Sequence, residues 1–287
     1  MRIGVMLGAD RVAHSIEHII DIAKRIEAAG LDNLWMANIR SHDAIMSMAL
    51  AGRETNRIGV GTAVTPTYPR HPIAIAQQTL TAAAATNGRF TLGIGVSHKV
   101  VIEHMYGLSY SRPARHTREY LEILMPLLRG ETVAYAGDRY HIQDIAIETP
   151  DAKPPQVVLA ALGPVMLKLA GTLADGTNTW MVGPKTMEQH IVKRITDAAA
   201  TAGKPKPLVV GGFPVVITDN QDKVKAELAE QIAIYGQLPS YRAMLDREGV
   251  SGPVDLAMVG DESRVRKQIE RLRDIGVTDF MAAIFNA

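Results

Sequence analysis

Hydrophobic residues along the chain alternate between short continuous runs and longer stretches with helical spacing. The short runs are rich in branched side chains, which is typical of buried β-strands. They occupy residues 3–7, 34–37, 57–64, 90–95, 157–161, 177–181, 208–218 and 278–285. In the first interval between them, apolar residues recur at Ile16, Ile19, Ile20, Ala23 and Ile26, as on one face of a helix. The pattern predicts eight strands, almost all separated by helices.

The predicted helices follow the strands in regular order. They cover residues 14–29, 42–52, 71–86, 113–128, 164–173, 185–202, 222–235, 239–247 and 261–275. Gly30 and Asn87-Gly88 are stop signals, because Gly and Asn readily take the left-handed conformation that ends a helix. Strand–helix–strand order implies parallel strands with right-handed crossovers. Eight such strands favour a closed (β/α)8 TIM barrel over an open doubly wound sheet, so we expect an α/β protein of that class.

One stretch, residues 131–155, breaks this rhythm. It contains Gly137 and three prolines, and its apolar residues Tyr140, Ile142, Ile145 and Ile147 are spaced in part as in a strand. We interpret it as an insertion between strands 4 and 5 that contains a β-hairpin. No linker rich in Gly, Ser and Pro divides the chain, which predicts a single domain over residues 1–287.

Composition narrows the class of protein. The length of 287 residues suits a barrel, which typically takes about 250. A net charge of +1 gives no indication of a nucleic-acid partner or an anionic membrane surface. The absence of cysteine excludes disulfides, thiolate metal sites and cysteine nucleophiles. No apolar run reaches the ~18 residues of a membrane span. We therefore expect a cytoplasmic protein.

The loops that follow the strands are where a barrel of this kind places its chemistry. These are residues 38–43, 63–72, 96–103, 161–166 and 180–184. In one of them Gly163-Pro164 precedes a predicted helix, and proline suits the first helical position. The free amides of a helix start bind phosphate, and Gly163 would let an anion approach closely. A plain strand-to-helix turn is the alternative interpretation.

Other motifs are weaker or absent. The run LGIGVS at residues 92–97 lacks the third glycine of a dinucleotide fingerprint, and no Walker, HExxH or GxSxG motif occurs. His14 and His18 lie four apart without an acidic third ligand, so we expect no metal site. Four further histidines lie near the strand ends: His42, His71, His98 and His104. Each is either a general acid or base of the reaction or a structural residue. Trp180 either packs against a flat cofactor ring or belongs to the core, whereas Trp35 is assigned to the core.

Four motifs in order along the chain resemble the luciferase-like monooxygenase superfamily. They are RIGVGTAVTPTYPRHP at 57–72, NGRFTLGIG at 87–95, AALGPVMLKLAG at 160–171 with ADG at 174–176, and VGDE at 259–262 with GVTD at 276–279. Within that superfamily the chain is most similar to the branch that uses coenzyme F420, a 5-deazaflavin. A branch that uses FMN shares the barrel and the first motif.

The resemblance implies roles for particular residues. It places a non-prolyl cis peptide at Ala63–Val64 as the support of the cofactor ring. It places the cofactor phosphate on Gly163, Pro164, Val165 and Met166. Val96, Ser97 and His98 would lie along the ring, with Trp180 near its edge. Asn38 would also contact the cofactor. Asn38 and Ile39 stand where sugar-phosphate dehydrogenases of the superfamily carry an Asp-His pair, and His98 where they carry a Glu. A sugar-phosphate substrate is therefore not expected, and His98 becomes the candidate proton donor.

Three functions stay open at this point. The leading one is hydride transfer between C5 of F420 and a C=C, C=N or C=O group, or an alcohol, of a small molecule. The second is an FMN-dependent monooxygenase that uses reduced flavin and O₂. The third is a non-catalytic carrier of flavin or deazaflavin on a degenerate barrel.

The helices after strands 2 and 3 carry apolar residues over much of their circumference. Their small and flexible members are Ala44, Met46, Met48, Ala49, Ala51, Ala74, Ala76 and Ala82 to Ala85. Such helices need cover on more than one side. This predicts a homodimer seam, which the resemblance also implies; packing within the outer helical layer is the alternative.

Overall fold

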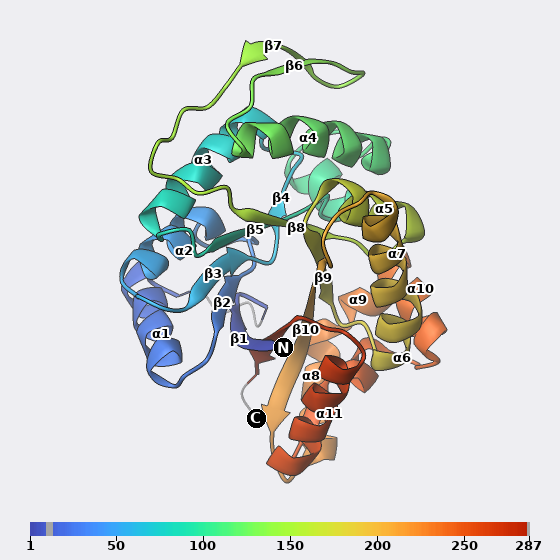
Figure 1. The fold of residues 1–287 in the computed structure, drawn as a ribbon. Helices are drawn as coiled ribbons and strands as arrows, with labels where there is room; N and C mark the ends of the chain where they lie inside the picture. Colours follow the sequence, from blue (N-terminus) through green and yellow to red (C-terminus); the bar gives the residue numbers. More distant parts are fainter. Residues whose placement is uncertain (10–13, 286–287) are drawn as a thin grey trace.

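Eight parallel strands close into a barrel in the computed structural model, which describes residues 1–9 and 14–285. They are β1 (Arg2–Leu7), β2 (Asn33–Met36), β3 (Gly59–Thr62), β5 (Phe90–Gly95), β8 (Gln156–Ala160), β9 (Gly176–Trp180), β10 (Leu208–Ile217) and β12 (Asp279–Ile284). The order β10-β12-β1-β2-β3-β5-β8-β9 is completed by pairing between β9 and β10, which closes the ring (Figure 1). The predicted (β/α)8 TIM barrel is confirmed.

Helices surround this barrel on its outer side (Figure 1). They are α1 (Ile16–Ala28), α2 (Ala44–Arg53), α3 (Pro72–Ala85), α4 (Pro113–Leu128), α5 (Pro164–Leu173), α6 (Pro184–Thr186), the π-helix η2 (Met187–Val192), α7 (Lys193–Thr201), α8 (Gln221–Ile232), α9 (Ile234–Gln237), α10 (Pro239–Glu248) and α11 (Glu262–Asp274). The predicted bounds of α4 and α5 match those observed. Within residues 14–285, none of the helices combines the length and apolar character needed to cross a bilayer.

The third predicted strand, residues 57–64, is shorter in the structure. It forms β3, which ends at Thr62, and the unpredicted β4 (Thr65–Pro66) follows after a break; both pair with β5. Gly61 pairs with Thr91 and Thr65 with Ile94, so four steps along this strand match three along β5. One extra residue is the mark of a β-bulge, which bends the strand locally. The predicted cis peptide between Ala63 and Val64 lies in this bulge.

Three short elements were not predicted from the sequence. They are the π-helix η1 (Val101–Met105), the 3-10 helix η3 (Pro253–Leu256) and the strand β11 (Met258–Gly260), which pairs with the end of β10. The predicted loop at residues 96–103 therefore runs into η1. Elements this short carry too few residues for a hydrophobic period to be recognised.

The predicted hairpin is present within the insertion. Its strands β6 (Val133–Ala136) and β7 (His141–Ile145) pair antiparallel and lie outside α3 and α4 (Figure 1). Its tip is tied to α4 by Glu119, whose carboxylate accepts the backbone N–H groups of Asp138 at 3.2 Å and Arg139 at 2.9 Å. Burial raises the pKa of Glu119, but these bonds and Arg115 outweigh it and hold the pKa below its usual value. The insertion therefore has a fixed attachment to the barrel.

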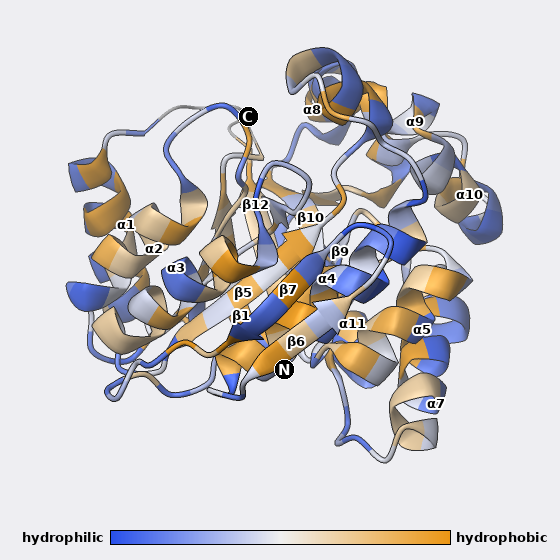
Figure 2. Cartoon of the chain, turned by 90° about the horizontal axis from the view of Figure 1, so that it is seen from above, coloured by the Kyte–Doolittle hydropathy of each residue, from blue (hydrophilic) through white to orange (hydrophobic). Residues whose placement is uncertain are grey.

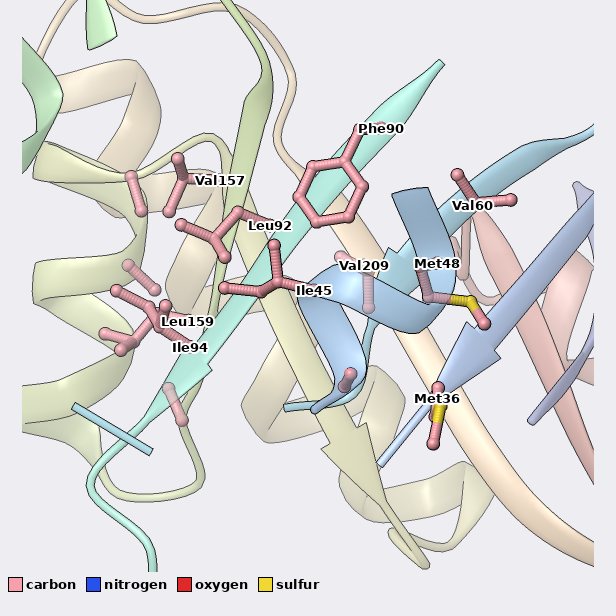
Figure 3. Close-up of a cluster of buried hydrophobic side chains, with 14 of the residues drawn as sticks. Met36, Ile45, Met48, Val60, Phe90, Leu92, Ile94, Val157, Leu159 and Val209 are labelled. Atoms are coloured by element: carbon pink, nitrogen blue, oxygen red, sulfur yellow. The ribbon is translucent and has the colours of Figure 1, made fainter. Parts of the chain in front are cut away.

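The core has two parts, an outer layer between the strands and the helices and a cluster inside the barrel. Hydrophobic residues lie along the strands and on parts of the surrounding helices (Figure 2). In the outer layer, Ile45 and Met48 of α2 pack toward the strands that carry Val60, Phe90 and Leu92 (Figure 3). A second cluster fills the barrel and contains Met6, Trp35, Val158, Val210 and Met281. Trp35 is only 2% exposed, as its assignment to the core predicts. Burial of each large side chain contributes about 1.5–3 kcal/mol.

The N-terminal end of the barrel is closed by a polar network around Asp279. Its Oδ1 accepts hydrogen bonds from Arg2 Nε at 2.7 Å and Asn33 Nδ2 at 3.1 Å, and its Oδ2 accepts the Thr278 hydroxyl at 2.8 Å. A Cβ added to Gly59 would lie 2.3 Å from Asn33 Oδ1, so only glycine fits beside this network. Each polar partner of the buried Asp279 side chain comes from a strand or from the residue that leads into one.

Candidate active site

The loop after β5 brings Val96, Ser97 and His98 to the C-terminal end of the barrel. Ser97 takes a left-handed conformation with a φ of 58°, which turns the chain out of the strand. The hydroxyl of Tyr110 donates to the Ser97 carbonyl at 3.4 Å. The His98 carbonyl accepts the N–H groups of Val101 at 2.9 Å and Ile102 at 3.0 Å, which fixes His98 at the start of η1. The loop is therefore held at both ends.

His98 is partly buried and has no charged neighbour that changes its ionisation. Burial alone lowers its pKa below the usual value for histidine. The ring is therefore mainly neutral at pH 7, with one N–H donor and one nitrogen that accepts a proton. Such a group can act as a base at neutral pH and as an acid at lower pH.

Three further aromatic rings extend from His98 across the strand ends. The ring of Tyr241 on α10 lies 6.0 Å from that of His98, and Tyr235 on α9 lies 5.0 Å from Tyr241, measured between centroids. Trp180, the last residue of β9, lies 6.3 Å from Tyr235. We call His98, Tyr241, Tyr235 and Trp180 the aromatic arc. The sequence analysis did not find Tyr235 and Tyr241, because nothing in the polar helical segment around them marks a site.

Seven buried side-chain polar atoms have no hydrogen-bond partner in the part of the chain that the structure describes. Two of them lie near these strand ends, the indole Nε1 of Trp180 and the hydroxyl of Thr65 in β4. Trp180 and Ala63 both pack on the cluster that fills the barrel. A buried polar group without a partner is uncommon and often marks a place where a ligand supplies the partner. A flat ring with polar edges is a ligand that could supply partners for these two atoms.

The start of α5 is open, as the sequence predicted. Gly163 is its N-cap residue, no side chain caps the helix, and a Cβ added to Gly163 would meet no atom within 4 Å. Five other helices begin with a side chain that accepts a first-turn N–H group: Ser15, Asp43, His71, Asn220 and Asp261. The amides of Val165 and Met166 and the space before Gly163 therefore suit a phosphate.

Positive charge lies beside this helix start. His190 Nε2 donates to the carbonyl of Leu162 at 2.8 Å, and Arg194 Nε donates to His190 Nδ1 at 3.0 Å. Burial lowers the pKa of His190, and the charges of Arg247 and Arg194 lower it further, although the bond to Leu162 raises it. Arg194 and Arg247 thus add a positive potential that favours an anion. His190, Arg194 and Arg247 could not be found from the sequence, because η2, α7 and α10 bring them there only in the folded chain.

Asn38 has a structural task in addition to its predicted contact with the cofactor. Its Oδ1 accepts the N–H of Ala44 at 3.0 Å, at the start of α2, and lies 3.5 Å from Arg70. Arg70 is held in turn by Asp43 at 2.7 Å. Only the amide NH₂ of Asn38 is therefore left to contact a ligand.

The remaining histidines have other surroundings. His42 and His104 are exposed, and His71 caps α3 through a bond from the Ile73 N–H at 3.3 Å. The rings of His14 and His18 lie 4.9 Å apart and tilted by 33°, and residues 1–9 and 14–285 contain no group of three His, Cys, Asp or Glu side chains placed to share an ion.

His116 was not found from the sequence. It is buried, bonds to Thr67 at 2.8 Å, and stacks on Tyr68 at 4.1 Å. Burial, aided by the charge of Arg139, lowers the pKa of His116 to about 4, so this ring is neutral at pH 7. Tyr68 stacks in turn on Tyr110, which holds Ser97. The cluster therefore supports the loop that carries His98.

A cavity of about 830 Å³ lies elsewhere, against α11. Phe213, Met258 and Leu272 contribute to its lining, and all three belong to the layer between strands and helices. None of the site residues predicted from the sequence lines it. We place the chemistry at the strand ends, because the uncapped helix and the aromatic arc are there.

Comparison with known proteins gives a consistent picture. Residues 1–279 match the model of the luciferase-like monooxygenase family. The chain is 30% identical to 5,10-methylenetetrahydromethanopterin reductase of Methanolobus tindarius over 245 residues, which cover 84% of this chain and 74% of that protein.

Two solved structures share the fold. An F420-dependent secondary alcohol dehydrogenase in complex with an F420-acetone adduct matches with a TM-score of 0.83 at 20% identity, over 99% of this chain and 93% of that one. The FMN complex of the oxygenating constituent of 3,6-diketocamphane monooxygenase from Pseudomonas putida, a type II Baeyer-Villiger monooxygenase, matches with a TM-score of 0.77 at 18% identity, over 99% and 92%.

Proposed function

We propose that this chain, which belongs to the luciferase-like monooxygenase family, is a coenzyme F420-dependent oxidoreductase. Its substrate would be a small organic molecule with a C=C, C=N or C=O group, or the corresponding alcohol. The observation that carries the proposal is the open start of α5 next to the loop that bears His98, since β8 and β5 are paired neighbours. An anion site and a proton-transferring group thus lie at adjacent strand ends. The relatives named for F420 support the choice of cofactor.

The residues at the strand ends would hold the cofactor in parts. The amides of Val165 and Met166 would bind its phosphate, with Gly163 and Pro164 shaping the approach. The Ala63–Val64 bulge and Val96 would support the ring, and Trp180 Nε1 would donate to its polar edge. When bound, the deazaflavin supplies or accepts a hydride at C5.

His98 supplies the proton that balances this hydride. In the reducing direction the substrate carbon accepts the hydride, and its oxygen accepts a proton from the imidazolium form of His98. In the oxidising direction neutral His98 takes the proton of the alcohol as the hydride leaves. Because burial lowers the pKa of His98, the oxidising direction is favoured at neutral pH and the reducing direction at lower pH.

Turnover assays test this function directly. We expect oxidised F420 to be reduced with secondary alcohols, or reduced F420 to be oxidised by ketones, enones or imines. The alternative, an FMN-dependent monooxygenase, has support from the FMN-bound structure of the same fold. Turnover with reduced FMN and O₂ on a ketone or aldehyde, without any turnover of F420, would favour that alternative and contradict our proposal.

We also propose that two copies of the chain associate through α2. Met46 is 61% exposed and Leu50 is 42% exposed, and they lie four residues apart on the outward face of a helix whose other side is buried. Two such residues on one face favour cover by a second copy. Sedimentation velocity should show a dimer at micromolar concentration, and Met46→Glu with Leu50→Glu should give a monomer. A monomeric native protein would remove the proposal.

A further inference from the structure

We propose that the aromatic arc forms the substrate-facing wall of the site and selects compact, uncharged substrates, with Tyr241 as the residue that meets the substrate opposite the cofactor ring. The inference rests on the proposed function and goes beyond it, because it names the class of substrate and the residue that selects it.

The arc crosses from one side of the site to the other. His98 follows β5 and Trp180 ends β9, while β8 stands between these two strands in the barrel. Tyr241 and Tyr235 join the two ends through ring contacts of 6.0, 5.0 and 6.3 Å along the series. The rings therefore connect the ends of β5 and β9, the two strands that flank β8 and the open helix start in the barrel order. A substrate that reaches both His98 and a cofactor bound at α5 would lie along these rings.

Tyr241 is held in place by contacts made elsewhere on α10. Arg242 donates to the carbonyls of Ser251 at 2.9 Å and Val250 at 3.0 Å. Glu248 accepts the N–H groups of Lys185 at 3.1 Å and Thr186 at 2.6 Å, which ties α10 to α6 beyond the end of β9. The ring is thus positioned by the framework of the site.

The charged side chains near the site have partners or positions away from His98. Arg70 pairs with Asp43 at 2.7 Å beside Asn38, and Arg194 and Arg247 act on His190 beside the helix start. No described charged side chain shifts the pKa of His98, which burial alone lowers, so His98 is neutral at pH 7. A carboxylate placed against the arc at pH 7 would therefore lose its hydration without gaining a charged partner among the described residues, which is strongly unfavourable. The helix start therefore suits the anionic part of the cofactor, and the arc suits a neutral substrate.

Tyr241 also offers a polar contact. Among the described residues, no hydrogen bond is made by its hydroxyl, and burial raises its pKa, so the group stays protonated and can donate. A ketone oxygen near His98 could accept from it. Recognition would then combine a hydrophobic face with a single neutral donor.

Two variants separate the ring from its hydroxyl. Tyr241→Phe keeps the wall and removes the donor, whereas Tyr241→Leu opens the wall, and Tyr106→Leu changes an exposed tyrosine outside the arc as the matched control. Acetone and pyruvate, ketones of similar size but different charge, serve as probes, with acetophenone as a larger neutral ketone. We expect the native enzyme to prefer acetone over pyruvate by at least about 100-fold in kcat/KM.

The variants should change substrate choice and leave cofactor binding intact. Tyr241→Leu should shift the ratio of acetophenone to acetone turnover by about tenfold or more, and Tyr241→Phe should lower kcat/KM for acetone about tenfold without that shift. Affinity for F420 should stay within about twofold in all three variants, because the phosphate site is untouched. Equal use of acetone and pyruvate, or an unchanged ratio in Tyr241→Leu, would overturn the proposal.

A chemical readout works without any turnover. The rate at which diethyl pyrocarbonate modifies His98, followed by mass spectrometry of the peptide, should rise severalfold in Tyr241→Leu but not in Tyr241→Phe or Tyr106→Leu. Acetone should protect His98 in the native protein, and pyruvate should not. If the native protein bound no F420, the proposed function would fail while this comparison still tested the arc. Equal modification rates in all variants, or equal protection by both ketones, would reject the arc on its own.

Discussion

The two ends of the barrel differ in whether their buried polar groups have hydrogen-bond partners. At the N-terminal end, the buried Asp279 carboxylate is matched by Arg2, Asn33 and Thr278. At the C-terminal end, Trp180 Nε1 and Thr65 Oγ1 are buried without partners within the described residues, and α5 starts without a cap. Satisfied polar groups stabilise a fold, whereas unsatisfied ones at a strand end leave hydrogen-bonding capacity that a ligand can use. The comparison assigns stability to the first end and chemistry to the second.

The backbone shows part of the same contrast. Turns that lead into β2, β5, β10 and β12 use glycine at positive φ (Gly30, Gly88, Gly203 and Gly276), although Asn87 before β5 also has a φ of 56°. Gly8 leaves β1 at 86°, whereas the loops that leave β5 and β9 place Ser97 at 58° and Met181 at 49°. Glycine takes these angles freely, while other residues do so at a cost that is usually accepted where a side chain has a function.

The largest expected effect is a loss of stability when the polar network around Asp279 is broken. Asp279→Ala leaves Asn33 buried without its partner and Arg2 without its carboxylate, so we expect a loss of about 2–4 kcal/mol in the free energy of unfolding. Urea denaturation measures the loss. F420 affinity of the remaining folded protein should stay unchanged. A variant as stable as the native protein would show that this end of the barrel is not the stabilising one.

A substitution at the other end should affect catalysis without affecting stability. His98→Gln keeps a polar side chain of similar size but cannot shuttle a proton, so we expect turnover to fall about 100-fold or more. Urea midpoints and F420 affinity should match the native protein. Equal loss of turnover and of stability would mean that His98 is part of the framework.

The pH dependence of turnover tests whether His98 is the proton-transferring group. Because burial lowers the pKa of His98, reductive turnover should fall, and oxidative turnover rise, as the pH increases through a value below ~6.5. The inflection should be absent from the residual activity of His98→Gln. An inflection that persists in the variant would assign the proton transfer to another group.

The smallest of these effects should come from filling the open helix start. Gly163→Val places a side chain where no atom lies within 4 Å, so the fold should tolerate it while the phosphate is displaced, weakening F420 binding about tenfold, or ~1.4 kcal/mol. Gly252→Val is the matched control, since Gly252 also precedes a proline and also faces open space. Equal affinities in the two variants would remove the anion site from α5.

Much of the fold could be predicted because buried parallel strands and amphipathic helices have clear periods. β5, α4 and α5 have the predicted bounds, and the insertion with its hairpin is where the pattern broke. The resemblance located the Ala63–Val64 bulge, which the continuous apolar run of residues 57–64 conceals. β11, with three residues, is too short to produce a period.

The site was predicted less completely. The helix start at Gly163 and the loop at His98 follow strands directly, so strand positions were enough to find them. Tyr241 and Arg194 reach the site from helices distant in sequence from those loops, and only the folded chain brings them there. Asn38 shows the reverse case, since the structure uses its carbonyl oxygen to start α2.

Parallel titration of the purified protein with oxidised F420 and FMN tests the central claim most directly, with fluorescence and difference spectra as readouts. The account predicts saturable F420 binding that is weakened in Gly163→Val and retained in Gly252→Val, together with FMN binding at least about tenfold weaker. Tight binding of FMN with no binding of F420, or F420 binding that Gly163→Val leaves unchanged, would contradict it.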